Sequence, residues 1–211
     1  MVQKQNVEFA AEDNVILRGW LFVPDGPGPH PAITMAHGFA GVKEHGLERF
    51  AQEFAAAGFV VLVHDHRGFG ASDGSPRHDI DPWVQIADWR RAISILESQA
   101  FVDPDRIGLW GSSYAGGHAI VLGATDRRLR AVVAQVPTIS GYQQGLRHVA
   151  PDLVPAWRRP SPTMNVDSST AHRPRPRPWS APTRRCLPPI DHLTPSRSTT
   201  NRSLRADGTT S

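Results

Sequence analysis

The stretch that decides the fold covers residues 106–117 and reads Arg-Ile-Gly-Leu-Trp-Gly-Ser-Ser-Tyr-Ala-Gly-Gly. Its first half, residues 106–110, is a short apolar run that predicts a buried β-strand. The glycine- and serine-rich turn after it leads into a predicted helix that ends near Ala124. A strand, a tight turn with a central serine and a helix together predict the local structure known as a nucleophile elbow.

Two serines stand in this turn, and only one of them fits at its centre. The turn is tight, so the residues two positions before and after the central serine must be small. With Ser113 at the centre, these residues are Gly111 and Ala115. With Ser112 at the centre, they would be a tryptophan and a tyrosine, which would clash. We therefore predict Ser113 as the nucleophile; a glycine- and serine-rich turn without chemistry is the alternative.

A second glycine-rich turn, His37-Gly38-Phe39-Ala40-Gly41, follows a predicted strand at residues 32–36. Acyl transfer needs two hydrogen-bond donors for the oxyanion of its tetrahedral intermediate. One donor is the backbone N–H after the nucleophile, here that of Tyr114. The loop after the earlier strand supplies the other, here the N–H of Phe39. Taken alone, this turn would be an ordinary strand-to-helix loop; beside the elbow it predicts an oxyanion hole.

Strands and helices alternate along the rest of the first 157 residues. Such alternation predicts an α/β fold with a mostly parallel sheet that helices cover on both faces. One predicted helix carries the stripe Leu47, Phe50 and Phe54 and ends at Gly58, and another begins at Asp81. Its apolar face carries Ile86, Trp89, Ile93 and Leu96. The predicted strands are residues 7–10, 15–22, 32–36, 59–63, 106–110 and 131–136, of which the last four are expected to be buried.

Composition divides the chain near Trp157. Residues 1–157 contain 13 Lys and Arg against 17 Asp and Glu, a net charge of −4. Residues 158–211 contain 10 Arg against 3 Asp, a net charge of +7, and are rich in Pro, Ser and Thr. A segment of this composition has few apolar side chains, and their burial cannot offset the entropy lost when the backbone is ordered. We therefore expect residues 158–211 to form a disordered tail. The acidic first part gives no reason to expect specific nucleic-acid binding.

Other classes of protein are disfavoured by local features. No stretch approaches the ~18 apolar residues of a membrane span. Residues 1–6 lack the apolar core of a signal peptide. The single cysteine, Cys186, excludes an internal disulfide. We therefore expect a cytoplasmic protein that does not contact membranes, and the oligomeric state cannot be read from the sequence.

Two segments besides the elbow are distinctive: Met-Ala-His-Gly-Phe at residues 35–39 and Asp-His-Arg-Gly-Phe-Gly-Ala-Ser at residues 65–72. Together with residues 102–117 and 131–137, they resemble the α/β-hydrolase superfamily, most closely its dienelactone-hydrolase and Xaa-Pro dipeptidyl-peptidase-like branch. The resemblance extends from Val7 to about Gly145. It implies a structural, loop-bracing role for Asp65 and Arg67.

The same resemblance implies a serine hydrolase that needs no cofactor or metal. Its substrate would be a small acyl compound: an ester, lactone, thioester or amide that forms an acyl-enzyme with the serine. A catalytically inactive fragment or pseudoenzyme is the first alternative. Weak binding of polyanions by the arginine-rich tail is the second.

A serine nucleophile also needs a histidine base and a carboxylate that orients it. In this superfamily both follow the serine in the chain, at the ends of later strands. No strand is visible after residue 136, so the last strands of the fold are expected to be missing and neither the triad acid nor the triad base is assigned. The abrupt change near Trp157 is typical of an out-of-frame reading of a GC-rich gene, which predicts a C-terminally truncated member. Several side chains are considered and not assigned. His118 is expected to be a packed or partly exposed helix residue, and His148 lies where a cap segment usually begins. The others are Asp152, Asp167, His172, Asp191 and His192.

Overall fold

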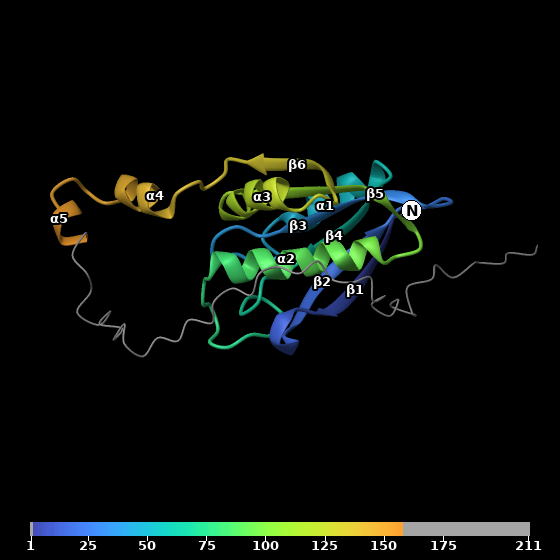
Figure 1. Cartoon of the computed structure of the whole chain (residues 1–211), viewed down its shortest axis with the longest axis horizontal. Coiled ribbons are helices and arrows are strands. Elements are labelled where there is room, and N and C mark those ends of the chain that lie inside the picture. Colours follow the sequence, from blue (N-terminus) through green and yellow to red (C-terminus); the bar gives the residue numbers. More distant parts are fainter. Residues whose placement is uncertain (1, 158–211) are drawn as a thin grey trace, which may run out of the picture.

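The structure is a computed structural model that describes residues 2–157. The predicted disordered tail, with Asp167, His172, Asp191 and His192, lies outside the described residues. The strands are β1 (Gln3–Ala10), β2 (Ile16–Val23), β3 (His30–Ala36), β4 (Val60–His64), β5 (Val102–Ser112) and β6 (Leu129–Gln135). The helices are α1 (Leu47–Ala56), α2 (Pro82–Glu97), α3 (Tyr114–Thr125), α4 (Gly141–His148) and α5 (Val154–Trp157), with a 3-10 turn at Glu12–Asn14 (Figure 1).

The six strands form one sheet in the order β1-β2-β4-β3-β5-β6. β2 runs antiparallel to both of its neighbours, β1 and β4. The pairs β3–β4, β3–β5 and β5–β6 are parallel. The prediction of a mostly parallel sheet with helices between the strands is therefore confirmed.

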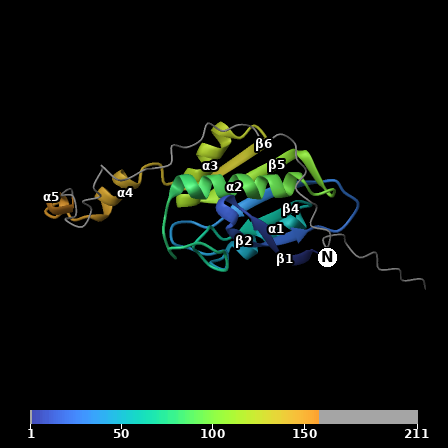
Figure 2. The same cartoon turned by 60° about the horizontal axis from the view of Figure 1, so that its bottom comes forward.

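Helices cover both faces of this sheet, as predicted. On one face, α2 and α3 pack on alternate residues of the strands, such as Val60 and Leu62 of β4. On the other face, α1 packs on the intervening residues, such as Val61 and Val63. Figure 2 shows α2 and α3 on one side of the sheet and α1 on the other. Because both faces are covered, β4 is buried along its whole length.

The predicted helix that begins at Asp81 is α2. The Asp81 carboxylate accepts hydrogen bonds from the backbone N–H groups of Trp83 and Val84, which caps the helix. The apolar face predicted for this helix, Ile86, Trp89, Ile93 and Leu96, is buried. In α1 the predicted stripe is only partly correct: Phe50 is 45% exposed and stacks on Trp110. Small residues at the helix–sheet contact, Ala51 and Ala55, are buried there instead.

The apolar run at residues 131–136 predicts a buried strand, but β6 is only partly buried. The expected loss of the last strands of the fold predicts, in contrast, that the sheet ends at this strand with an apolar edge. Within the described residues β6 pairs on one side only, with β5, so it forms an edge of the sheet. Its Val133 is 51% exposed, and Val136, just after it, is 76% exposed. The apolar side chains in and just after β6 are therefore more exposed to solvent than an apolar run predicts. Beyond β6, helices α4 and α5 extend away from the sheet (Figure 1).

The parallel register brings the carboxyl ends of strands β3, β4, β5 and β6 to the same end of the sheet. Ala36 at the end of β3 pairs with His64 of β4 and with Gly111 of β5. Ser112, at the end of β5, pairs with Gln135 of β6. The segments that follow these strands carry all the predicted site residues, and they therefore meet at this end of the sheet.

Candidate active site

Ser113 lies between β5 and α3 in a strained backbone conformation. Its φ is 56° and its ψ is −118°, and residues held in such sparsely populated regions cost on the order of 1–3 kcal/mol each. A Cβ on Gly111 would lie 2.4 Å from the carbonyl oxygen of Ala115. The sequence predicted a small residue two positions before Ser113, and the geometry is stricter: only glycine fits there. Ser112, in contrast, is the last residue of strand β5.

The backbone of Ser113 is anchored to the chain that follows β6. Its N–H donates to the Gln135 carbonyl over 2.9 Å, and its carbonyl accepts from the Thr138 N–H, also over 2.9 Å. A Cβ on Gly117 would lie 2.4 Å from the carbonyl oxygen of Thr138, so the first turn of α3 packs closely on the same segment. These contacts hold the turn rigidly in its strained form.

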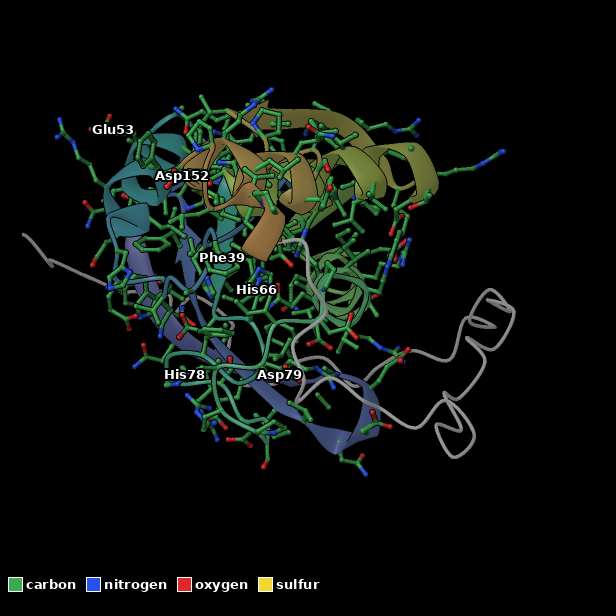
Figure 3. All side chains as sticks on the ribbon, turned by 90° about the vertical axis from the view of Figure 1, so that its left-hand side faces the viewer. Phe39, Glu53, His66, His78, Asp79 and Asp152 are labelled. Atoms are coloured by element: carbon green, nitrogen blue, oxygen red, sulfur yellow. The ribbon has the colours of Figure 1, made fainter. Side chains whose placement is uncertain are left out.

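The predicted oxyanion loop lies against the elbow. A Cβ on Gly38 would be 3.4 Å from Ser113 Cβ and 3.9 Å from Ser113 Oγ. The rings of Phe39 and Tyr114 meet edge to face, with their centroids 5.5 Å apart. The structure thus brings Ser113, Phe39 and Tyr114 together. Figure 3 looks at this end of the molecule, where Phe39 and His66 both lie.

The N–H groups predicted as oxyanion donors are available for a ligand. Within residues 2–157, neither the Phe39 N–H nor the Tyr114 N–H donates a hydrogen bond to the protein. Tyr114 is the first residue of α3, and the N–H groups of a first helical turn have no partner within the helix. They also lie at the positive end of the helix dipole, which favours a negative oxygen.

Asp65, at the end of β4, connects two loops beside the site. Its carboxylate accepts hydrogen bonds from the Lys43 N–H over 2.7 Å and from the Ala71 N–H over 3.0 Å. It also pairs with the Lys43 ammonium over 2.5 Å. A Cβ on Gly70 would lie 2.2 Å from the carboxylate, so this glycine lets the loop wrap around Asp65. Lys43 was missed in the sequence, since a lysine in a loop is usually exposed.

Arg67 holds the next part of the same loop. Its guanidinium forms two hydrogen bonds of 2.6 Å to the carboxylate of Asp88 on α2. The Asp88 side chain is fully buried. This bidentate pair ties the loop after β4 to the helix that covers the sheet.

Four histidines cluster under the loops: His37, His64, His66 and His118. Ring centroids of neighbouring members lie 4.6 to 5.7 Å apart. Within the described part of the chain, neither ring nitrogen of His64 or His66 has a hydrogen-bond partner. Burial lowers the pKa of His64 to about 3 and lowers the pKa of His66 as well. These imidazoles are therefore neutral at ordinary pH, and they lie in the core instead of facing a substrate.

His118, in helix α3, is buried in the interior, which is the first of the two environments that the sequence allowed. It is 3% exposed, and its Nε2 lies 3.0 Å from the Gln85 side-chain oxygen. Its ring also packs on Tyr114, with centroids 4.6 Å apart. Burial lowers the pKa of His118 to about 4. His118 thus supports Tyr114 from inside the fold.

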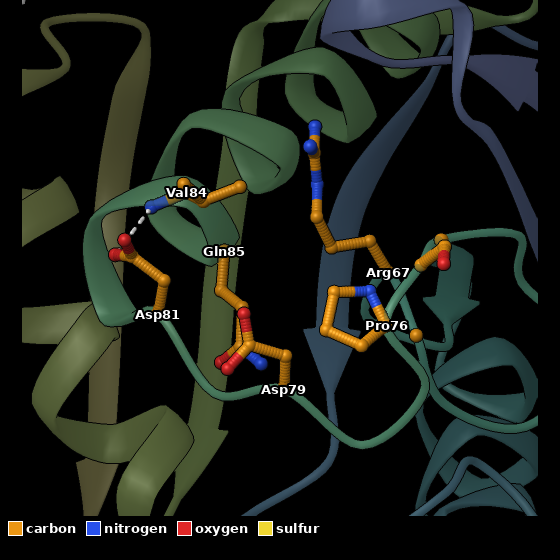
Figure 4. Close-up of a pocket in the computed structure, with 9 residues that line it drawn as sticks. Arg67, Pro76, Asp79, Asp81, Val84 and Gln85 are labelled. Atoms are coloured by element: carbon orange, nitrogen blue, oxygen red, sulfur yellow. Dashed lines mark hydrogen bonds between the residues drawn. The ribbon is translucent and has the colours of Figure 1, made fainter. Parts of the chain in front are cut away.

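Gln85 also lines a cavity of about 150 Å³ between the loop after β4 and the first turn of α2 (Figure 4). Asp79 and Asp81 contribute carboxylates to its wall. The remaining lining residues are Arg67, Gly68, Gly74, Ser75, Pro76 and Val84. Burial raises the pKa of Tyr114, and the negative charge of Asp81 raises it further. The charge of Asp81 in the cavity wall therefore acts on Tyr114, the residue after Ser113.

No histidine or carboxylate among residues 2–157 forms a hydrogen bond with Ser113 Oγ. His148 is exposed at the end of α4, and Asp152 is exposed in the segment between α4 and α5. Within the same residues no group of three or more His, Cys, Asp or Glu side chains is arranged to bind a metal ion. No helix of this part is both long and apolar enough to cross a membrane. The described residues thus contain the elbow and the predicted oxyanion loop, but no side chain that bonds to Ser113 Oγ as a base would.

Comparison with known proteins agrees with this architecture. Residues 13–184 match the X-Pro dipeptidyl-peptidase (S15) family. The chain is 38% identical over 141 residues to the quorum-quenching protein AidA of Acinetobacter baumannii, covering 67% of this chain and 46% of that protein. It is 36% identical over 176 residues to the thiohydrolase AneE of Aspergillus aculeatus, covering 83% of this chain and 54% of that protein. The chain spans about half the length of these relatives.

Solved structures give the same fold. The α/β hydrolase GrgF from Penicillium sp. superimposes with a TM-score of 0.58 at 36% identity, covering 61% of this chain and 44% of that one. The structure of DcsB with its substrate analogue gives a TM-score of 0.62 at 35% identity, covering 71% and 56%. With the family match over most of its length and this fold, the chain belongs to the X-Pro dipeptidyl-peptidase (S15) family of α/β hydrolases.

Proposed function

We propose that Ser113 is the nucleophile of an acyl-transfer reaction and that the N–H groups of Phe39 and Tyr114 bind the oxyanion. The observation that supports this best is the strained elbow: Ser113 lies against Gly38, next to two N–H groups that have no acceptor in residues 2–157. Ser113 Oγ loses its proton to solvent and bonds to the acyl carbon, and the bond to the leaving group breaks. Water then hydrolyses the acyl-serine ester, which releases the acid and restores the serine hydroxyl. One oxyanion donor contributes about 3–4 kcal/mol to lowering the barrier.

Among the described residues, the site lacks a group that accepts the hydroxyl proton of Ser113. A serine hydroxyl is a poor nucleophile unless a neighbour accepts its proton, and none of the described side chains does so. In a serine protease, losing the base costs about 10⁶ in turnover, and the remaining groups still give ~10³–10⁴ over water. We therefore propose slow acyl transfer by the described residues. The inactive pseudoenzyme is the alternative, and the rate separates the two.

The leaving group decides which substrates such a site would process. An amine must be protonated before it leaves, which needs a general acid. A thiol has a pKa near 8.5, so it leaves as a thiolate without this help. Relatives named as thiohydrolases, together with a polyketide transferase, support the same choice. We therefore propose thioesters and activated esters as the substrate class, ahead of amides.

Labelling by a fluorophosphonate probe tests the nucleophile. The full chain is incubated with the probe, and intact mass followed by peptide mapping locates the adduct. We expect slow labelling at Ser113 that Ser113→Ala abolishes and Ser112→Ala leaves within about two-fold, because Ser112 belongs to the strand. An adduct at another residue, or unchanged labelling of Ser113→Ala, would contradict the proposal.

A further inference from the structure

His37 lies beneath the oxyanion loop, and both of its ring nitrogens have partners. It is 3% exposed. Its Nδ1 lies 2.9 Å from the carbonyl oxygen of Gly38, and its Nε2 accepts a hydrogen bond of 3.1 Å from the His66 backbone N–H. The imidazole therefore connects the loop after β3 with the loop after β4.

These two partners fix the tautomer of His37. A backbone N–H only donates, so Nε2 must offer its lone pair to His66. A carbonyl oxygen only accepts, so Nδ1 must carry the proton that it donates to Gly38. The lone pair of Nε2 is thus occupied by the His66 N–H, and His37 cannot serve as the base for Ser113.

The carbonyl that His37 holds belongs to the peptide unit of the predicted donor. Gly38 C=O and Phe39 N–H are the two ends of one trans peptide, which is planar, so they point in opposite directions. The Gly38 carbonyl accepts a second hydrogen bond of 3.2 Å from the Gly41 N–H. Two bonds on the carbonyl side therefore set the direction in which the Phe39 N–H points.

We infer that His37 is a positioning residue: its Nδ1–H fixes the Gly38–Phe39 peptide so that the Phe39 N–H faces the oxygen of the reacting acyl group. This inference rests on the proposed roles of Ser113 and Phe39. Burial lowers the pKa of His37 and so maintains the neutral form that the two contacts require. A protonated ring would place an Nε2–H against the His66 N–H, donor against donor.

The two contacts can be separated by substitution. The side-chain nitrogen of an asparagine occupies the place of Nδ1, so His37→Asn keeps a donor for Gly38. His37→Gln places its amide near the position of Nε2, so it reaches His66 and leaves the Gly38 carbonyl without this donor. His37→Leu removes both contacts. If His37 acts through the peptide, Asn should preserve the function and Gln should lose it; a role in packing alone would not separate these two variants.

The test uses the full chain labelled with ¹⁵N, and two readouts. NMR identifies which ring nitrogen of His37 carries the proton and records the Phe39 amide signal; fluorophosphonate labelling gives the rate at Ser113. We expect an Nδ1–H tautomer, a shifted Phe39 amide in His37→Gln and His37→Leu, and a labelling rate about 10-fold to 100-fold lower in both, up to the loss of one oxyanion donor. His37→Asn should keep the Phe39 amide signal and label within about three-fold of wild type.

An Nε2–H tautomer would overturn the inference, as would wild-type labelling in His37→Leu or equal losses in the Asn and Gln variants. If Ser113→Ala labels like wild type, the proposed nucleophile fails; the tautomer and the Phe39 amide then still decide whether His37 orients the peptide. If His37→Leu or His37→Gln does not fold, the wild-type tautomer and the Phe39 amide of His37→Asn decide the matter. A Phe39 amide in His37→Asn that is shifted away from wild type would then count against the inference.

Discussion

The carboxylate of Asp65 lies 2.5 Å from the ammonium nitrogen of Lys43, and both side chains are buried. Asp65 follows β4 and Lys43 follows β3, so the pair joins the loop that bears Phe39 to the loop that bears His66. The Lys43 ammonium also lies 5.1 Å from the ring centroid of Trp20. A charge in such a place is stable only with its partner, since an unpaired buried charge is costly.

Lys43→Met should therefore destabilise the fold by about 3 kcal/mol or more, because it leaves the Asp65 carboxylate buried without its counter-ion. Arg130→Met is the matched control: its pair with Asp105 is exposed, and exposed pairs contribute about 0–1 kcal/mol. Urea unfolding at pH 7 measures both. Equal, small losses in the two variants would show that the buried pair carries no special weight.

The buried histidines predict acid lability. The folded-state pKa of His64 is about 3 and that of His118 about 4, against an unfolded value of 6.5. Below pH 6.5 the two histidines therefore bind protons in the unfolded chain but not in the folded chain. The free energy of unfolding consequently falls as the pH falls. Each histidine contributes a loss of up to about 1.4 kcal/mol per pH unit until its own folded pKa is reached.

His64→Leu should flatten this loss, since leucine removes the titrating group and can fill much of the same apolar site. His45→Gln, which removes an exposed histidine, should leave the slope unchanged. Unfolding free energies at several pH values between 4 and 7 give the slopes. A slope in His64→Leu as steep as in wild type would mean that this histidine is protonated in the folded protein.

The elbow should tolerate no side chain at residue 111. A Cβ there would meet the backbone oxygen of Ala115 at 2.4 Å, so Gly111→Ala must open the turn and move Ser113. We expect slower fluorophosphonate labelling and a fold weakened by about 1–3 kcal/mol, as for other overpacked sites. Gly141→Ala is the control, since nothing lies within 4 Å of its Cβ. A Gly111→Ala protein that labels like wild type would contradict the geometry of the elbow.

The sequence predicted the elements that have strong local signals. The α2 face and the glycine at residue 111 could be predicted because helix periodicity and a tight turn restrict the residue types directly. The contacts of Lys43, His66 and Gln85 could not, because they join segments far apart in the chain. The apolar run at residues 131–136, taken alone, predicts a buried strand. The lack of strand signals after it predicts instead that the sheet ends there with an apolar edge, and the sheet order of the described residues agrees.

The free edge of β6 should promote association. Val133 is 51% exposed on a strand whose outer side has no partner within residues 2–157, and unpaired apolar edges recruit other chains. We expect the full chain to bind a hydrophobic dye and to form larger species as its concentration rises. Val133→Lys should reduce both effects, because a charge disfavours strand pairing at an edge. Sedimentation velocity at several concentrations measures this, and a strictly monomeric wild-type protein would refute it.

Added imidazole should accelerate the reaction of Ser113. Beside the serine lie the two N–H groups that we propose as oxyanion donors, but no described side chain bonds to Ser113 Oγ as a proton acceptor, so an external base would supply what the site lacks. Labelling of wild type by the fluorophosphonate should rise with imidazole concentration and saturate if imidazole binds beside Ser113. Ser113→Ala controls for direct reaction of imidazole with the probe. Fast labelling without imidazole would show instead that the chain already has a base, and replacing His148, His172 and His192 in turn would then identify it.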